Sequence, residues 1–199
     1  MKFFVNFLSA FRILAAFLII PTIMHNWYWI TFIIYVLGAL SDWFDGFLAR
    51  KYNCTSKIGG VLDSISDKIF VCITMVLLTI MTPVWFIIIP VLIMIARELY
   101  ISGLREFLGT QKMEMPVSKN RFALAKIKTT LQMIATVLFF LMFAVGSSIT
   151  PNTTSRFVFY LIYILPQTGV FCLWTALVAS LLSAIQYTHT FAKKIKKMK

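Results

Sequence analysis

Long apolar stretches separated by short polar breaks dominate the chain, and this pattern predicts membrane-spanning helices. Each stretch has about 20 residues, the length that an α-helix needs to cross the hydrocarbon core of a bilayer. A short amphipathic segment, residues 1–9, precedes the first stretch and is expected to form an interfacial helix. We therefore predict an all-α polytopic membrane protein with six transmembrane helices. The expected spans are 11–24, 28–51, 59–81, 84–107, 125–146 and 157–187.

Composition leaves room for little besides these spans. Of the 199 residues, 60% are hydrophobic, so residues 1–199 are expected to form a single membrane domain without a separate soluble domain. A formal net charge of +12 would suit a nucleic-acid-binding protein. In so apolar a chain, cytoplasmic loops and anionic lipid head groups explain it better. We therefore expect membrane lipid, and no nucleic acid, among the partners.

All four aspartates of the chain fall within one short stretch. If the flanking segments are helical, Asp42 and Asp45 lie one turn apart on one helix. Asp63 and Asp67 then lie one turn apart on the next. Four carboxylates in one small volume repel each other unless a cation compensates their charge. Because oxygen ligands suit hard ions, the pattern predicts Mg²⁺ or Mn²⁺ rather than zinc.

Small residues and one arginine lie between the acids. Gly46 and Ala49 share the helical side of the first acid pair, and Gly59 and Gly60 open the second helix. Glycine inside a helix costs about 1 kcal/mol relative to alanine, so Gly46 indicates that a bulky group approaches the backbone there. Arg50 supplies a planar, forked cation suited to phosphate. For each glycine alone, close helix packing in the membrane is the alternative.

Together these residues form a pattern of eight fixed residues over 26 positions. It reads Asp42-x2-Asp45-Gly46-x2-Ala49-Arg50-x8-Gly59-x3-Asp63-x3-Asp67. The pattern resembles the signature of the CDP-alcohol phosphotransferase family and matches it at every invariant residue and at both long gaps. The resemblance implies a membrane enzyme that holds a CDP-linked lipid through two divalent metal ions and transfers its phosphatidyl group to an alcohol, releasing CMP. It also implies a homodimer.

The resemblance further implies roles for individual residues. The four aspartates would hold two Mg²⁺ or Mn²⁺ ions, and Asp67 would also serve as the general base for the acceptor hydroxyl. The residues by themselves leave the base open, because neighbouring carboxylates and a metal ion act on proton affinity in opposite directions. The residues that would hold CDP-diacylglycerol are Gly46, Ala49, Arg50, Ser56 and Gly59.

The N-terminal segment carries a further match. The string Asn6-x-Leu8-Ser9-x2-Arg12 resembles the opening that the family places near the nucleotide, so Asn6 joins the expected CDP-diacylglycerol site. Composition alone supports an interfacial helix anchored by aromatic residues just as well.

Two stretches in the second half resemble the phosphatidylglycerophosphate synthase branch of the family, which associates them with the acceptor. They are residues 97–107, in ARELYISGLREF, and residues 125–132, AKIKTTLQ. Four side chains there would supply positive charge for the phosphate of sn-glycerol 3-phosphate: Arg97, Arg105, Lys126 and Lys128. Each is explained equally well as a positive-inside anchor. Ala125 departs from the branch, which usually has glycine there, and its methyl group limits how closely the backbone can be approached.

Charge also predicts the orientation in the membrane. Six spans place both termini on one side, and 18 basic residues lie on or near the face of the aspartates, whereas only Arg156 lies opposite. By the positive-inside rule that face is cytoplasmic. We expect a multi-pass protein of the cell (inner) membrane whose termini and active site face the cytoplasm.

The last apolar region is expected to be irregular. Pro166 and Gly169 fall early in it, so it should either kink or begin as an interfacial segment. The basic tail, AKKIKKMK, is interpreted as a topology signal without a catalytic role.

Other acceptors and another class of protein stay open at this point. The same chemistry could serve a cardiolipin synthase-type lipid acceptor or an inositol phosphate, whereas cationic residues in the fourth and fifth spans disfavour serine. Intramembrane carboxylates also form cation sites in transporters. A cation transporter would explain the four acids, but not Gly46, Ala49 and Arg50.

Overall fold

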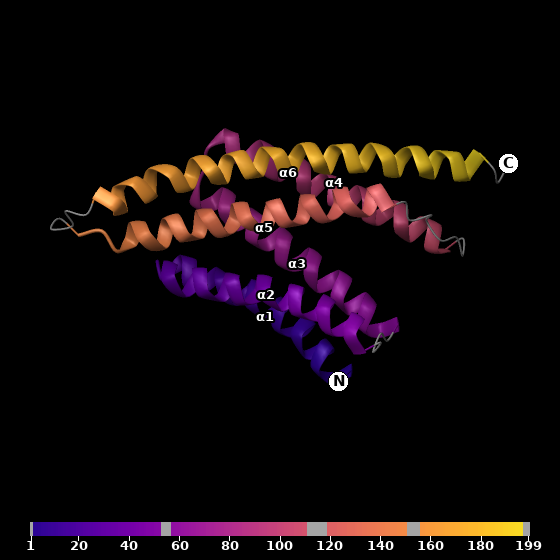
Figure 1. Cartoon of the computed structure of the whole chain (residues 1–199), viewed down its shortest axis with the longest axis horizontal. Helices are drawn as coiled ribbons and strands as arrows, with labels where there is room; N and C mark the ends of the chain where they lie inside the picture. Colours follow the sequence, from indigo (N-terminus) through magenta and orange to yellow (C-terminus); the bar gives the residue numbers. More distant parts are fainter. Residues whose placement is uncertain (1, 53–56, 111–118, 151–155, 197–199) are drawn as a thin grey trace. The chain divides into compact units, whose positions relative to one another are not determined.

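A computed structural model of the chain describes residues 2–52, 57–110, 119–150 and 156–196, and the regular elements in these ranges are α-helices (Figure 1). They are α1 (Lys2–Met24), α2 (Tyr28–Tyr52), α3 (Lys57–Met81), α4 (Trp85–Thr110), α5 (Lys119–Ser147) and α6 (Arg156–Lys196). The prediction of an all-α chain is confirmed, and each predicted span corresponds to one helix.

Two helices are more continuous than the sequence pattern predicted. α1 runs without a break from Lys2, so the segment expected as a separate interfacial helix is the beginning of the first span. α6 likewise runs through Pro166, where we expected an irregularity. The Thr168 hydroxyl donates to the carbonyl oxygens of Ile164 and Leu165, each at 3.0 Å.

Most of these helices are suited to a bilayer. In the described residues, α1, α3, α4, α5 and α6 are long and apolar enough to cross a membrane, and α2 carries a shorter apolar stretch, Tyr28–Ser41. Large apolar side chains such as Leu92, Tyr163 and Phe171 are exposed, as expected of side chains that face lipid. The chain is therefore a multi-pass membrane protein.

The chain divides into two compact units. Unit 1 comprises Met1–Met81 and Thr136–Gly169, and unit 2 comprises Thr82–Ala135 and Val170–Lys199. α5 and α6 therefore contribute to both units. The aspartates predicted as metal ligands belong to unit 1, and both predicted acceptor segments belong to unit 2.

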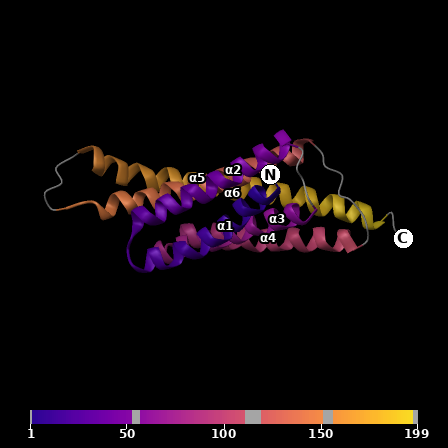
Figure 2. The ribbon, with the colours of Figure 1, turned by 90° about the horizontal axis from the view of Figure 1, so that it is seen from below.

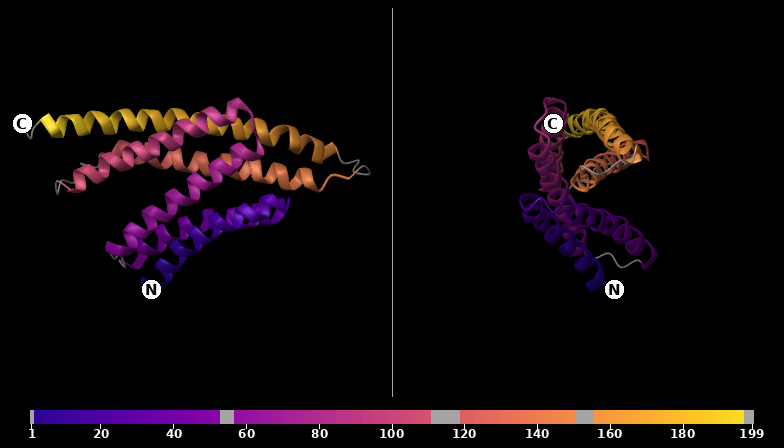
Figure 3. Two further views of the ribbon diagram at one scale, coloured as in Figure 1. Left: turned by 180° about the vertical axis from the view of Figure 1, so that it is seen from behind. Right: turned by 90° about the vertical axis from the view of Figure 1, so that its left-hand side faces the viewer.

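In unit 1, α1 packs against both α2 and α3 (Figures 2 and 3). The ring of Tyr35 stacks on Phe70 with centroids 5.2 Å apart and meets Phe140 edge to face at 5.1 Å. A Cβ atom on Gly38, one turn after Tyr35, would come within 2.6 Å of the Phe70 ring. Gly38 therefore permits the close approach of α2 and α3 that small residues provide in membrane helix packing.

A tight turn joins α1 to α2. Asn26 has a φ of 58°, in the left-handed region that asparagine adopts more readily than most residues. Nearby, the Trp29 indole nitrogen donates to the Ser148 hydroxyl at 2.7 Å and so links the start of α2 to the residue after α5. The carboxylates lie at the other end of α2, so this turn defines the end of the helix distant from them.

In unit 2, α4 and the second half of α6 run parallel. The Trp174 indole nitrogen donates to the Phe86 carbonyl oxygen at 3.1 Å, and the rings of Phe107 and Phe191 meet edge to face with centroids 5.7 Å apart. Early residues of α4 thus meet early residues of this half of α6, and late residues meet late ones. The parallel alignment keeps the polar ends of both helices together.

Candidate functional site

Two of the four predicted metal ligands have described side chains, and both belong to unit 1. Asp63 and Asp67 lie one helical turn apart on α3, so their side chains share a face. The Asp63 side chain is 47% exposed, whereas Ser66, on the intervening turn, is buried. The helix therefore presents two carboxylates together, and Asp63 is open to a ligand.

A buried arginine on α1 contacts two residues of α3, one of them from this pair of carboxylates. Arg12 is fully buried, and its Nη1 atom donates to Asp63 Oδ1 and to Ser66 Oγ, each at 3.3 Å. The Ser66 hydroxyl in turn donates to the Asp63 carbonyl oxygen at 2.9 Å. A charge-assisted bond of this kind orients the carboxylate that accepts it. Arg12 thus connects α1 to the acidic face of α3.

Arg12 was missing from the site residues predicted by sequence. In the sequence analysis Arg12 is only the last residue of the string that assigns Asn6 to the nucleotide site. It is otherwise counted among the basic residues near the cytoplasmic face. A usable signal was present, because an arginine inside an apolar span needs a partner, and the chain offers few anions besides the four aspartates.

The other half of the predicted site falls on residues whose side chains lie outside the described part of the chain. These residues are Asp42, Asp45, Gly46, Ala49 and Arg50, in the last turns of α2, Ser56 in the connection, and Asn6 in α1. Gly59, in the first turn of α3, is described and buried. The meeting of all four carboxylates therefore stays a prediction.

Chain connectivity limits how far apart the two halves can be. α2 ends at Tyr52 and α3 begins at Lys57, so the two helix ends lie within about 18 Å of each other even if the connection is fully extended. Among the described side chains, no group of three or more histidine, cysteine and acidic residues comes together. The two described carboxylates nevertheless suit a hard divalent cation by their chemistry, because both offer oxygen donors one helical turn apart on α3.

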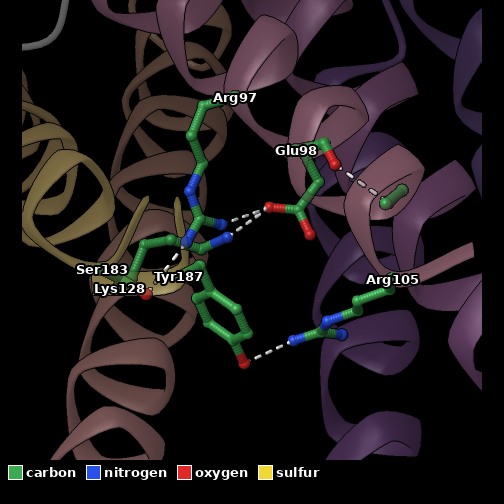
Figure 4. Close-up of polar contacts among 7 residues, drawn as sticks. Arg97, Glu98, Arg105, Lys128, Ser183 and Tyr187 are labelled. Atoms are coloured by element: carbon green, nitrogen blue, oxygen red, sulfur yellow. Dashed lines mark hydrogen bonds and ion pairs between the residues drawn. The ribbon is translucent and has the colours of Figure 1, made fainter. Parts of the chain in front are cut away.

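Unit 2 holds a cluster of charged side chains that centres on Glu98. Its Oε2 atom accepts hydrogen bonds from Arg97 Nη1, at 3.0 Å, and from Lys128 Nζ (Figure 4). Arg97 and Lys128 are each only 8% exposed. Arg97 Nη2 also donates to the Ser183 hydroxyl at 3.0 Å. Residues of α4, α5 and α6 therefore share one polar network inside apolar helices.

A third cation joins this region from the next turns of α4. The Arg105 guanidinium donates to the Tyr187 hydroxyl at 2.8 Å and lies 5.1 Å from the centroid of its ring (Figure 4). Lys126 is exposed on α5, two residues before the buried Lys128. Residues two apart on a helix face different directions. Three of the four predicted acceptor residues thus gather in unit 2, whereas Lys126 faces another way.

Sequence reasoning missed Glu98, Ser183 and Tyr187. Glu98 had a signal, because it lies beside Arg97 in an apolar span and charges inside membrane spans are usually paired. Ser183 and Tyr187 are one turn apart on α6, but serine and tyrosine are ordinary in membrane helices, so the sequence offered no signal for them. Ala125 of the predicted acceptor segment lies outside the described side chains.

Comparison with known proteins adds an independent finding. The family model described as "CDP-alcohol phosphatidyltransferase" matches residues 3–182. Over 145 residues the chain is 41% identical to the CDP-diacylglycerol–glycerol-3-phosphate 3-phosphatidyltransferase of Cereibacter sphaeroides, which covers 68% of this chain and 62% of that protein. Proteins of the same name are 36% identical over 141 residues in Blochmanniella floridana and 42% identical over 103 residues in Escherichia coli K12.

These matches cover the relatives incompletely. The alignment with the Blochmanniella protein covers 66% of this chain and 70% of the relative, and the alignment with the Escherichia protein covers 52% and 56%. The chain thus spans less than two thirds of the length of two of these three relatives. The family match, by contrast, includes the complete carboxylate signature and both acceptor segments.

Proposed function

The chain belongs to the CDP-alcohol phosphatidyltransferase family, and from this premise we propose that it transfers the phosphatidyl group of CDP-diacylglycerol to sn-glycerol 3-phosphate. The products are phosphatidylglycerophosphate and CMP. The observation that carries the proposal is the family match over residues 3–182, which encloses all eight residues of the signature. The names of the similar proteins support sn-glycerol 3-phosphate as the acceptor.

The proposed enzyme depends on divalent metal ions. Asp42, Asp45, Asp63 and Asp67 would hold two Mg²⁺ or Mn²⁺ ions, because each pair lies one turn apart on its helix and offers only oxygen donors. When bound, such ions neutralise charge on the pyrophosphate and on the departing CMP. Arg12 supports this site by holding Asp63 Oδ1 from the buried side.

The protein's own residues bind the lipid and move the proton. Asn6, Gly46, Ala49, Arg50, Ser56 and Gly59 are proposed to hold CDP-diacylglycerol. A carboxylate oxygen of Asp67 takes the proton from an acceptor hydroxyl, and the hydroxyl oxygen attacks the phosphorus that bears the diacylglycerol. A new bond forms between that oxygen and phosphorus, and the phosphorus–oxygen bond to CMP breaks with its electron pair leaving on CMP.

The acceptor phosphate is proposed to bind the cations of unit 2. Arg97, Lys128 and Arg105 are oriented by Glu98, Ser183 and Tyr187, as described above. Lys126, which is exposed, would contribute charge from the rim of the site. Oriented cations favour a phosphorylated acceptor over serine.

The membrane placement is also part of this proposal. We place the protein in the cell (inner) membrane as a homodimer, with its termini and active site at the cytoplasmic face. The distribution of basic residues supports this orientation, because 18 of 19 lie on or near the face of the aspartates.

One assay tests the reaction and the acceptor together. Purified protein in detergent is given CDP-diacylglycerol and Mg²⁺, and CMP release is measured with sn-glycerol 3-phosphate, inositol phosphate, serine or phosphatidylglycerol. We expect release with sn-glycerol 3-phosphate alone. Release with only another acceptor would keep the chemistry and refute the acceptor, whereas no release with any of the four would refute the proposed function.

A further inference from the structure

Glu98 is an anion among the cations that are proposed to bind the acceptor phosphate. One of its oxygens, Oε2, accepts from both Arg97 and Lys128, which reach it from α4 and α5 (Figure 4). Its side chain is 26% exposed, so it is more accessible than either cation. Two buried cations side by side would repel each other without it. Glu98 therefore holds them in one place.

Both arginines are also held by residues of α6. Arg97 donates to Ser183, and Arg105 donates to Tyr187. Within the described chain, the Nε atom of Arg97 is buried without a hydrogen-bond partner. The guanidinium of Arg97 is thus fixed at both terminal nitrogens while one further donor stays unused. A buried, oriented donor of this kind is prepared to bind an anion at little cost in side-chain ordering.

The charges of the cluster match one kind of acceptor. Of the four charged residues Arg97, Lys128, Arg105 and Glu98, three are positive and one is negative, so their sum is +2. A phosphate monoester carries about −1.5 to −2 at pH 7. A phosphodiester carries a single negative charge, and an unphosphorylated hydroxyl compound such as inositol carries none. A monoester dianion is therefore the acceptor head group that neutralises this cluster.

We propose that Glu98 is a positioning residue of the acceptor site, which holds Arg97 and Lys128 on one carboxylate oxygen and sets the site's charge to match a phosphate monoester. This inference rests on the proposed function, because it concerns the acceptor of that reaction. Glu98 acts through the two cations and not on the reacting atoms.

The test separates acceptor binding from lipid binding in the full-length protein. CMP release is measured while sn-glycerol 3-phosphate is varied at saturating CDP-diacylglycerol, and then with the two substrates exchanged. We expect Glu98→Gln to raise the KM for sn-glycerol 3-phosphate about tenfold or more, because oriented charge-assisted bonds are lost. The KM for CDP-diacylglycerol should change little. Glu98→Asp, which keeps the charge, should recover part of the loss.

Two further variants keep the test decisive. Lys193→Ala removes an exposed charge from α6, outside both acceptor segments, and should leave both KM values unchanged. Ser183→Ala removes only the second anchor of Arg97, a small change that the fold should tolerate, and should raise the acceptor KM by a smaller factor. If Glu98→Gln does not fold, an unchanged acceptor KM in Ser183→Ala overturns the inference.

The charge match has its own measurement on the unmodified protein. The methyl ester of sn-glycerol 3-phosphate has the same hydroxyls but a single negative charge. We expect its KM to be about tenfold higher than that of the monoester, and equal KM values would overturn the charge match. An unchanged or lower acceptor KM in Glu98→Gln, or a parallel rise of both KM values, would overturn the positioning role. Failure of the proposed function differs, because the unmodified protein would then release no CMP.

Discussion

The ion pair beside the predicted metal site of unit 1 and the charged cluster of unit 2 are built from different numbers of buried cations, paired in each case with a single carboxylate that is more exposed. In unit 1 the Arg12 cation is fully buried, and the Asp63 carboxylate that it binds is 47% exposed. In unit 2 the cations Arg97 and Lys128 are buried, and the Glu98 carboxylate between them is the more exposed partner. Arg12 holds its carboxylate from the buried side, whereas Glu98 is more exposed than the two cations that it pairs with.

The difference shows how a membrane chain can present charge without leaving it unpaired. Charged side chains inside spans are costly unless they are paired. Arg12 pairs with Asp63, whose side chain stays 47% exposed, and the single carboxylate of Glu98 pairs with two cations, Arg97 and Lys128. The two regions should therefore respond differently to loss of metal and to loss of individual side chains.

Removal of metal ions gives the largest expected effect and should act through unit 1. We expect EDTA to abolish CMP release and added Mg²⁺ or Mn²⁺ to restore it, because the proposed ligands are carboxylate oxygens, which suit hard ions. CMP release is measured before chelation, after it and after metal is added back. Recovery with zinc alone would contradict the oxygen-ligand site.

Asp67→Asn should produce the next largest effect. The substitution keeps the size of the side chain but removes the proposed base and one metal-ligand charge, so we expect turnover to fall by about 10³-fold or more. The measurement is kcat for CMP release, with circular dichroism and size-exclusion chromatography as checks that the variant folds. Near-normal activity in a folded variant would remove Asp67 from the mechanism.

Arg12→Ala should act on the metal requirement. Because Arg12 orients a proposed ligand through Asp63 Oδ1, we expect the Mg²⁺ concentration for half-maximal activity to rise about 10–100-fold. The measurement is a Mg²⁺ titration of CMP release, and Arg156→Ala, an exposed arginine of the same unit, is the matched control. A fall in the Mg²⁺ requirement would show instead that Arg12 competes with the metal for Asp63.

Arg105→Ala should give the smallest effect of the four and should act on unit 2. Arg105 is exposed and is held by Tyr187, so we expect its loss to raise the KM for sn-glycerol 3-phosphate by about tenfold, and more than the KM for CDP-diacylglycerol. Lys193→Ala, an exposed cation on α6, is the control. A larger change in the lipid KM would assign Arg105 to the nucleotide side.

The helices were predictable because apolar stretches between polar breaks are typical of membrane spans. Apolar stretches between polar breaks located all six, and each corresponds to one helix. The continuity of α1 and α6 was not predictable in the same way. The polar character of residues 1–9 and the proline at 166 look like interruptions in the sequence, but both lie inside continuous helices.

The shared face of the two described aspartates was predictable, because it depends only on spacing along one helix. Asp63 and Asp67 share a face because four residues make about one turn. Pairs between helices were not predictable, because the rotation of each helix about its axis decides which residues meet. Arg12 meets Asp63 across 51 positions, and Lys128 meets Glu98 across 30. The same rotation turns Lys128 inward and leaves Lys126 exposed, although the sequence placed them together.

The glycines of this chain should differ in how well they tolerate substitution. A Cβ atom on Gly38 would meet the fully buried Phe70 ring, and one on Gly169 would meet Phe139 at 2.9 Å. At Gly60, Gly103, Gly109 and Gly146 an added Cβ would meet nothing within 4 Å. In a saturation library selected for function, glycine should therefore be retained at positions 38 and 169, whereas other residues should be accepted at the four open positions. The surviving sequences would then show which glycines helix packing requires.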